Sequence, residues 1–195
     1  MGNNNSKQAM PKLTNEMIAE CVKISHFNED EVKKLYKRFE IIAQSQIHDG
    51  VVDIGEFQQA LGIESRGFAH RIFNAFDKNS SLTIEFKEFV NSLSVMCPKA
   101  TVDEKAKFIF KVYDKNGDGD ITKEELSEIL EFSLSENKAV HLTPQQIEQV
   151  VNSTFKQFDN DKSGAITLDE FLKAANQNPS ILNCVSLNYN TLMGE

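Results

Sequence analysis

Apolar residues recur at helical spacing along the chain and are interrupted by four short polar segments. Two of these segments have apolar residues one and four positions ahead of them, Phe76 and Phe73 in one case and Phe158 and Phe155 in the other. An apolar residue also follows directly after each of the four segments: Phe57, Phe89, Leu126 and Phe171. Residues three or four apart lie on one face of a helix. The pattern therefore predicts four helix–loop–helix repeats that share one packing frame, meaning that apolar residues stand at equivalent positions beside each polar segment.

The third and fourth polar segments, 114–125 and 159–170, match one calcium-binding template. Ca²⁺ takes about six to eight oxygen ligands, and the EF-hand loop supplies them from positions 1, 3, 5, 7, 9 and 12 around a glycine at position 6. Here the glycines are Gly119 and Gly164. The expected ligands are Asp114, Asn116, Asp118, the Asp120 carbonyl, Thr122 and Glu125 in the third loop, and Asp159, Asp161, Ser163, the Ala165 carbonyl, Thr167 and Glu170 in the fourth. The alternative, two acidic surface turns, does not explain why the glycine and the closing glutamate recur at fixed offsets.

The second polar segment, 77–88, keeps the template except at position 6, where Leu82 replaces glycine. Its candidate ligands are Asp77, Asn79, Ser81, Thr83, Glu85 and Glu88. Leucine adopts a positive φ only at a cost on the order of 1 kcal/mol. We therefore expect weak calcium binding or a rearranged loop, and a degenerate loop retained for packing is the open alternative.

The first polar segment is recognisable from its end. Positions 6, 8 and 12 are matched by Gly50, Val52 and Glu56. A twelve-residue loop would put Gln44 and Ile41 one and four positions ahead of it, whereas a fourteen-residue loop puts Ile42 and Phe39 there. The helix phase therefore favours fourteen residues. Because such a loop has no acidic side chain before Asp49, calcium would need many backbone carbonyls, and its occupancy stays open.

Position 8 of each loop can form a short antiparallel bridge to its partner loop, which pairs Val52 with Ile84 and Ile121 with Ile166. The expected fold is thus all-α, with four EF-hands in two paired lobes joined internally by short β bridges. Capping boxes or close variants mark three helix starts: Asn28 with Glu31, Thr101 with Glu104, and Thr143 with Gln146. The expected domains are an N-terminal arm (1–26), an N-terminal EF-hand pair (27–97), a C-terminal pair (98–178) and a tail (179–195).

Charge and composition narrow the function classes. A net charge of −8 argues against nucleic-acid binding, which needs a basic footprint. The three cysteines, Cys21, Cys97 and Cys184, have no metal-type spacing and are expected to be packed thiols in a reducing compartment. No stretch is long enough to span a membrane, no secretory signal is recognised, and no catalytic constellation is found. We therefore expect a cytoplasmic protein that is not an enzyme.

The amino terminus carries a lipidation signal. Met-Gly-Asn-Asn-Asn-Ser at 1–6 fits the pattern for N-myristoylation of Gly2, the alternative being an ordinary polar tail. A single myristoyl chain gives only marginal, reversible membrane affinity, about 10⁴ M⁻¹. We therefore expect reversible peripheral contact with a membrane through the N-terminal myristate.

These features together resemble the calcineurin B and calcineurin B-like calcium sensors over nearly the whole chain. The resemblance rests on four EF-hands, the acylation-type start, the run His-Phe-Asn-Glu-Asp-Glu-Val-Lys-Lys-Leu at 26–35 and the short Pro-containing linker at 97–100. The fourteen-residue first loop and the runs at 68–73 and 178–182 resemble plant-type calcineurin B-like proteins, which regulate serine/threonine kinases. Calcineurin B itself, the regulatory subunit of a calcium-dependent phosphatase, is similar at 26–39 but has a twelve-residue first loop.

The resemblance implies an intracellular Ca²⁺ sensor that acts as the regulatory subunit of a serine/threonine kinase and holds an amphipathic target helix in a hydrophobic groove. The alternative is the calcineurin B-type subunit of the phosphatase. A plain Ca²⁺ buffer is less well supported, because the two lobes and the acylation motif go beyond what a buffer, which barely opens, would need. The chain departs from many plant-type members in lacking the Phe-Pro-Ser-Phe tail. The apolar tail from Pro179 to Leu192 is expected to occupy the empty groove.

Overall fold

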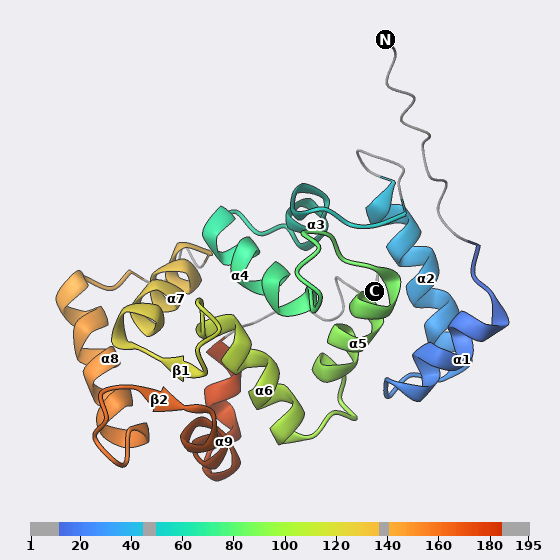
Figure 1. The fold of residues 1–195 in the computed structure, drawn as a ribbon. Helices are drawn as coiled ribbons and strands as arrows, with labels where there is room; N and C mark the ends of the chain where they lie inside the picture. Colours follow the sequence, from blue (N-terminus) through green and yellow to red (C-terminus); the bar gives the residue numbers. More distant parts are fainter. Residues whose placement is uncertain (1–11, 45–49, 137–140, 185–195) are drawn as a thin grey trace. The chain divides into compact units, whose positions relative to one another are not determined.

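The computed structural model describes residues 12–44, 50–136 and 141–184, and the regular secondary structure of this part of the chain is almost entirely helical (Figure 1). Gly2 and the end of the tail therefore lie outside the described residues. The elements in chain order are α1 (Asn15–Lys23), α2 (Glu29–Ala43), α3 (Ile54–Leu61), α4 (Arg66–Phe76), α5 (Phe86–Met96), α6 (Val102–Tyr113), β1 (Asp120–Ile121), α7 (Lys123–Glu136), α8 (Pro144–Phe158), β2 (Ile166–Thr167), α9 (Leu168–Gln177) and the 3₁₀-helix η1 (Pro179–Cys184). Within these described ranges, no helix is long and apolar enough to cross a membrane.

The helices begin where the sequence places their caps. At the start of α2, the side chain of Asn28 accepts the N–H of Glu31 at 2.9 Å, and Glu31 accepts the N–H of Asn28 at 2.7 Å. The same reciprocal pair opens α6 and α8, at Thr101 and Thr143. Each box satisfies two backbone donors that a helix start otherwise leaves without partners.

Contacts divide the described chain into two compact units, one made of residues 12–44, 50–62 and 76–99 and the other of 63–75, 100–136 and 141–184. Most of α4 thus groups with the third and fourth hands, and its last residue, Phe76, groups with the first unit. The domain boundaries expected from the sequence stay a prediction.

The first unit has an aromatic core built from the predicted packing frame. Phe39 of α2 lies 5.3 Å from Phe89 of α5, and Phe57 of α3 lies 5.1 Å from Phe76, measured between ring centroids. All four rings are at most 1% exposed. The predicted bridge between the two loops is confirmed, since Val52 and Ile84 pair in antiparallel fashion.

Helix α1 was missed by the sequence analysis, which treated residues 1–26 as an arm. It packs against α2 and α5 of the first unit and buries Ile18 and Cys21. Glu20 forms an ion pair with Lys87 of α5. The apolar spacing of this short helix is visible in the sequence, but no loop template marks its ends. Cys21 and Cys97 are both buried free thiols, as expected.

The second unit holds the paired strands β1 and β2 (Figure 1). Ile121 lies opposite Ile166, as predicted. Helix α6 packs against α9, and α7 packs against α8. The ring of Phe110 on α6 lies 5.8 Å from that of Phe171, the residue after the last closing glutamate. The tail begins as η1, which lies against α6 and α9. The all-α fold with paired EF-hands is therefore confirmed.

Candidate calcium sites

The third loop is held in a tight wrap by hydrogen bonds from its own backbone. Gly119, at φ +92°, donates its N–H to Asp114 Oδ2 at 3.0 Å, and Gly117 donates to Asp114 Oδ1 at 2.7 Å. Asp118 Oδ1 accepts the N–H of Asp120 at 3.0 Å. A Cβ added to Gly119 would meet nothing within 4 Å, so the positive φ, and not a shortage of space, requires glycine there.

The fourth loop shows the same wrap with different side chains. Gly164, at φ +89°, donates to Asp159 Oδ2 at 3.0 Å, and the N–H of Ser163 donates to Asp161 Oδ1 at 2.9 Å. Hydrogen bonds from Ser163 lower the pKa of Asp161, which favours its charged form.

The fourth loop also offers a direct test of whether calcium fits. One carboxylate oxygen from each of Asp159, Asp161 and Glu170 lies within 4.8 Å of the other two. Oxygens on opposite sides of an ion with bonds of about 2.5 Å stand at most about 5 Å apart. The three predicted ligands are therefore already gathered at the spacing of a calcium coordination sphere, and the hard oxygen donors match the preference of Ca²⁺.

The second loop adopts this conformation as well, despite Leu82. The leucine sits at φ +65° and donates its N–H to Asp77 Oδ2 at 2.9 Å, as a position-6 glycine does. Ser81 donates its N–H to Asp77 Oδ1 at 3.0 Å and its hydroxyl to the Thr83 carbonyl at 2.9 Å. The side chain of Leu82 is 77% exposed, so no burial offsets the strain of its backbone. The second loop therefore has the backbone strain expected from the sequence, but it does not adopt the rearranged conformation that the sequence analysis gave as one possibility.

The first loop is described only in part, because residues 45–49 lie outside the described residues. Gly50 has φ +84° and precedes the Val52 bridge. Helix α2 buries Phe39 and Ile42 and leaves Ile41 62% exposed. That is the helix phase from which the sequence analysis inferred a fourteen-residue loop; the loop length itself stays a prediction.

Each closing glutamate ties the two ends of its loop together. Glu125 accepts the N–H of Lys115, at position 2, through Oε1 at 2.8 Å, and the N–H of Thr122, at position 9, through Oε2 at 2.9 Å. The same two bonds recur in the other two fully described loops, at Glu88 from Lys78 and Glu85 and at Glu170 from Asn160 and Thr167. The sequence template names the glutamates but gives no sign of the position-2 amide.

Burial and hydrogen bonding act in opposite directions on these carboxylates. Glu125 is 7% exposed, and burial alone would raise its pKa. Hydrogen bonds from Thr122 and Lys115 outweigh burial, so the pKa of Glu125 falls below its ordinary value. The pKa of Glu170 is lowered in the same way, by Thr167 and Asn160. Both closing carboxylates are therefore kept ionised, as a calcium ligand must be.

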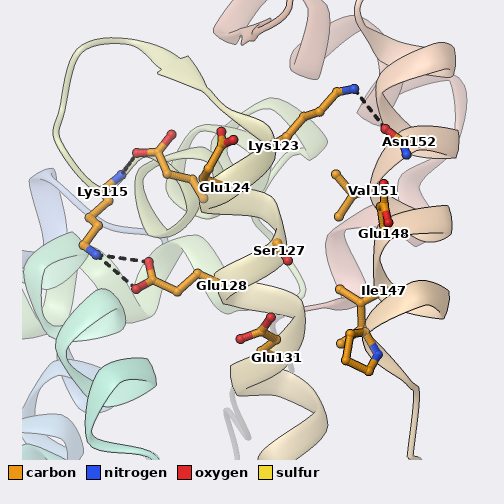
Figure 2. Close-up of a pocket in the computed structure, with 12 residues that line it drawn as sticks. Lys115, Lys123, Glu124, Ser127, Glu128, Glu131, Ile147, Glu148, Val151 and Asn152 are labelled. Carbon is orange, nitrogen blue, oxygen red and sulfur yellow. Dashed lines mark hydrogen bonds and ion pairs between the residues drawn. The ribbon is translucent and has the colours of Figure 1, made fainter.

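A groove of about 750 Å³ runs between α7 and α8 (Figure 2). Its apolar floor is Ile147 and Val151, which are only 7% and 4% exposed. The carboxylates of Glu124, Glu131 and Glu148 line it. Its several carboxylates distinguish this groove from the hydrophobic target groove expected from the sequence, and thirteen of the fourteen phenylalanines are buried within the described chain. The structure thus shows no open aromatic face among the described residues.

Comparison with known proteins agrees with this geometry. A family model of the EF-hand domain pair matches residues 103–176, which hold the third and fourth loops. The chain is 32% identical over 189 residues to the type 1 calcineurin B protein of Dictyostelium discoideum, an alignment that covers 97% of this chain and 99% of the relative. It is 33% identical over 179 residues to the type 2 calcineurin B protein of the same organism, covering 91% and 94%.

A third relative, calcineurin B of Naegleria gruberi, is 34% identical over 173 residues, covering 89% of this chain and 92% of the relative. Similarity to these relatives therefore covers most of the chain and extends well beyond residues 103–176, which the family model matches. The loop geometry and these relatives lead to one conclusion: the chain belongs to the calcineurin B-like family of EF-hand calcium-binding proteins.

Proposed function

We propose that this protein is the calcium-sensing, non-catalytic regulatory subunit of a serine/threonine phosphatase. The observation that carries the proposal is the match to calcineurin B over nearly the full length of both chains. The relatives' names favour this reading over the kinase subunit that the sequence analysis preferred. The fourth loop supports calcium binding, since carboxylate oxygens of Asp159, Asp161 and Glu170 lie within 4.8 Å of one another.

The residues that would hold calcium are the predicted ligands of the third and fourth loops, with those of the second loop as a weaker set. Bound calcium draws the closing glutamate toward the start of its loop, which in EF-hand sensors swings the exiting helix and exposes an apolar face. In this chain the closing glutamates Glu125 and Glu170 stand at the starts of α7 and α9. We propose that the face so exposed receives an amphipathic helix of the catalytic subunit.

A kinase partner remains the second candidate, because one structural observation favours it. The burial of Phe39 and Ile42, with Ile41 exposed, matches the helix phase of a fourteen-residue first loop. That loop length is one of the features by which the sequence resembles plant-type kinase regulators. The two readings differ only in the partner, so the partner is what must be identified.

The test is affinity capture of the tagged full-length protein from its own cells, with calcium and with chelator, followed by mass spectrometry. The matched control is the double variant Glu125→Gln, Glu170→Gln, which keeps the shape of both closing residues and removes their charge. A phosphatase catalytic chain whose activity responds to calcium only when the wild-type protein is added back supports the proposal. A serine/threonine kinase shows that the second candidate is right, and a protein with no stoichiometric partner in either condition is a buffer.

We further propose a cytoplasmic protein with reversible membrane contact through a myristoyl group on Gly2. The support is the acceptor motif at the amino terminus. Mass spectrometry of the protein from its own cells should show the mass of one myristoyl chain, and Gly2→Ala should remove it. An unmodified amino terminus in the wild-type protein would contradict this proposal.

A further inference from the structure

Helix α4 leads into the second calcium loop, yet it and the residues just before it contact side chains of α7, the exiting helix of the third hand. At its start, the backbone N–H groups of Glu64 and Ser65 donate to the carboxylate of Glu136, at 3.1 and 2.6 Å. One turn on, Gly67 lies so close to Phe132 that an added Cβ would overlap the ring. A capping carboxylate and a close approach at glycine fix α4 on this helix.

The third contact between these helices is a buried arginine. Arg71 is 6% exposed and forms an ion pair with Glu128 of α7. Its other terminal nitrogen donates to the backbone carbonyl of Tyr113 at 3.1 Å. Arginine has five donors in a planar fork, which is the geometry needed to hold two acceptors at once. A guanidinium this buried persists only because both partners are in place.

The two acceptors of Arg71 belong to opposite ends of the third calcium loop. Tyr113 is the last residue of α6 and directly precedes Asp114, the ligand at position 1. Glu128 stands three residues after Glu125, the ligand at position 12, and so lies nearly one turn further along α7. The arginine therefore links the helix that enters the third loop to the helix that leaves it.

Lys115 extends this link into the loop itself. Its ammonium forms an ion pair with Glu128 (Figure 2), at 3.0 Å from Oε1, and its backbone N–H donates to Glu125. We infer that Arg71, carried by the second hand, is a positioning residue for the third calcium site. It fixes the spacing between the ligands at positions 1 and 12, so the loop needs less ordering when calcium binds.

A competing electrostatic effect has the opposite sign. A positive charge near a calcium site repels the ion, so removing a cation should by itself strengthen binding. The charge of Arg71 is already matched by Glu128, whereas the Lys115 side chain, on the same carboxylate, is 59% exposed. Positioning and charge repulsion therefore predict opposite results for Arg71→Met, and Lys115→Met measures the charge effect with little loss of buried structure.

The experiment is a calcium titration of the full-length protein followed by the backbone amide signals of Gly119 and Gly164 in two-dimensional ¹H–¹⁵N NMR spectra. Each of these N–H groups donates to the position-1 carboxylate of its own loop, so each reports one site. Arg71→Met should raise the calcium midpoint read at Gly119 by about three- to tenfold and shift the midpoint at Gly164 less. Arg66→Met, an exposed cation in the first turn of the same helix, should leave both midpoints unchanged.

Arg71→Lys keeps the charge but loses the fork, and should recover part of the affinity. Should Arg71→Met fail to fold, as judged by its amide spectrum, this conservative variant carries the test, with a smaller rise in the Gly119 midpoint expected. A Gly119 midpoint that is unchanged or lower in the folded Arg71 variants would overturn the inference. Equal shifts at Gly119 and Gly164 would also overturn it, because they would show a general loss of stability.

Discussion

Leu82 donates its backbone N–H to Asp77 at 2.9 Å, the same bond that Gly164 makes to Asp159 at 3.0 Å. The leucine holds this bond at φ +65°, and the glycine does so at φ +89°. A left-handed backbone costs an L-residue roughly 1 to 2 kcal/mol and costs glycine little. The second loop therefore keeps the geometry of a calcium site at an energetic cost that the fourth loop does not have.

Leu82→Gly should increase the calcium affinity of the second loop by about fivefold, the equivalent of roughly 1 kcal/mol. The change removes a side chain that is 77% exposed, so little packing is lost. The amide signal of residue 82 during a calcium titration measures this site directly. The matched control is Gly164→Leu, which introduces the same strain where a Cβ meets nothing within 4 Å and should weaken the fourth site by a similar factor.

An unchanged affinity in Leu82→Gly, together with a weakened fourth site in Gly164→Leu, would show that strain at position 6 does not limit the second loop. In that case the lack of a carboxylate at both positions 3 and 5, where Asn79 and Ser81 stand, would be the reason for weak binding.

The closing glutamates should matter both with and without calcium. Glu125→Gln should weaken the third site at least tenfold, because a bidentate charged ligand becomes a neutral one. In metal-free protein it should also lower the free energy of unfolding by about 1 to 3 kcal/mol, since Lys115 and Thr122 would donate toward an amide where they now meet a carboxylate. Calcium titration and urea unfolding measure the two effects. An unfolding free energy equal to that of the wild type would show that these hydrogen bonds do not stabilise the empty loop.

The sequence predicted the loops and the helix caps because these depend on local chemistry, and it predicted the bridges because position 8 recurs in each loop repeat. Gly119 needs its positive φ, Asn28 meets its partner within one turn, and Val52 finds Ile84 once both loops form. What the sequence did not predict are contacts between elements far apart in the chain. Arg71 meets Glu128 only after α4 packs on α7, and no spacing rule relates residues 57 positions apart.

Partner choice was also beyond local chemistry. The helix phase at Phe39 and Ile42 is read correctly from the sequence, but a loop length does not specify which surface a catalytic subunit recognises. Relatives that align over nearly their whole length give evidence about the kind of catalytic partner that a single loop length does not give.

Acid should destabilise the metal-free protein partly through Glu128. Burial alone would raise the pKa of this carboxyl, but hydrogen bonds and charge from Lys115 and Arg71 lower it below its ordinary value. The pKa of Glu128 is lower in the folded protein than in the unfolded chain, where a glutamate has a pKa of about 4.3. The stabilisation is therefore fully present at pH values above the unfolded-state pKa and is lost as the pH falls through the folded-state pKa. Glu128→Gln cannot lose this contribution, so its urea midpoint should fall less steeply below about pH 5 than that of the wild type. Parallel curves would show that the ion pair with Arg71 adds no pH-dependent stability.

Calcium should expose apolar surface if the protein is a sensor. Thirteen of the fourteen phenylalanines are buried, and Phe132 is half-buried against α4. A target helix therefore has no aromatic face to bind until helices separate, and EF-hand sensors achieve this when the loops close. Fluorescence of a hydrophobic dye such as ANS should rise several-fold when calcium is added to the wild-type protein and remain low in the double variant Glu125→Gln, Glu170→Gln. Tight calcium binding with no rise in dye fluorescence would instead identify a buffer, because buffer EF-hands barely open.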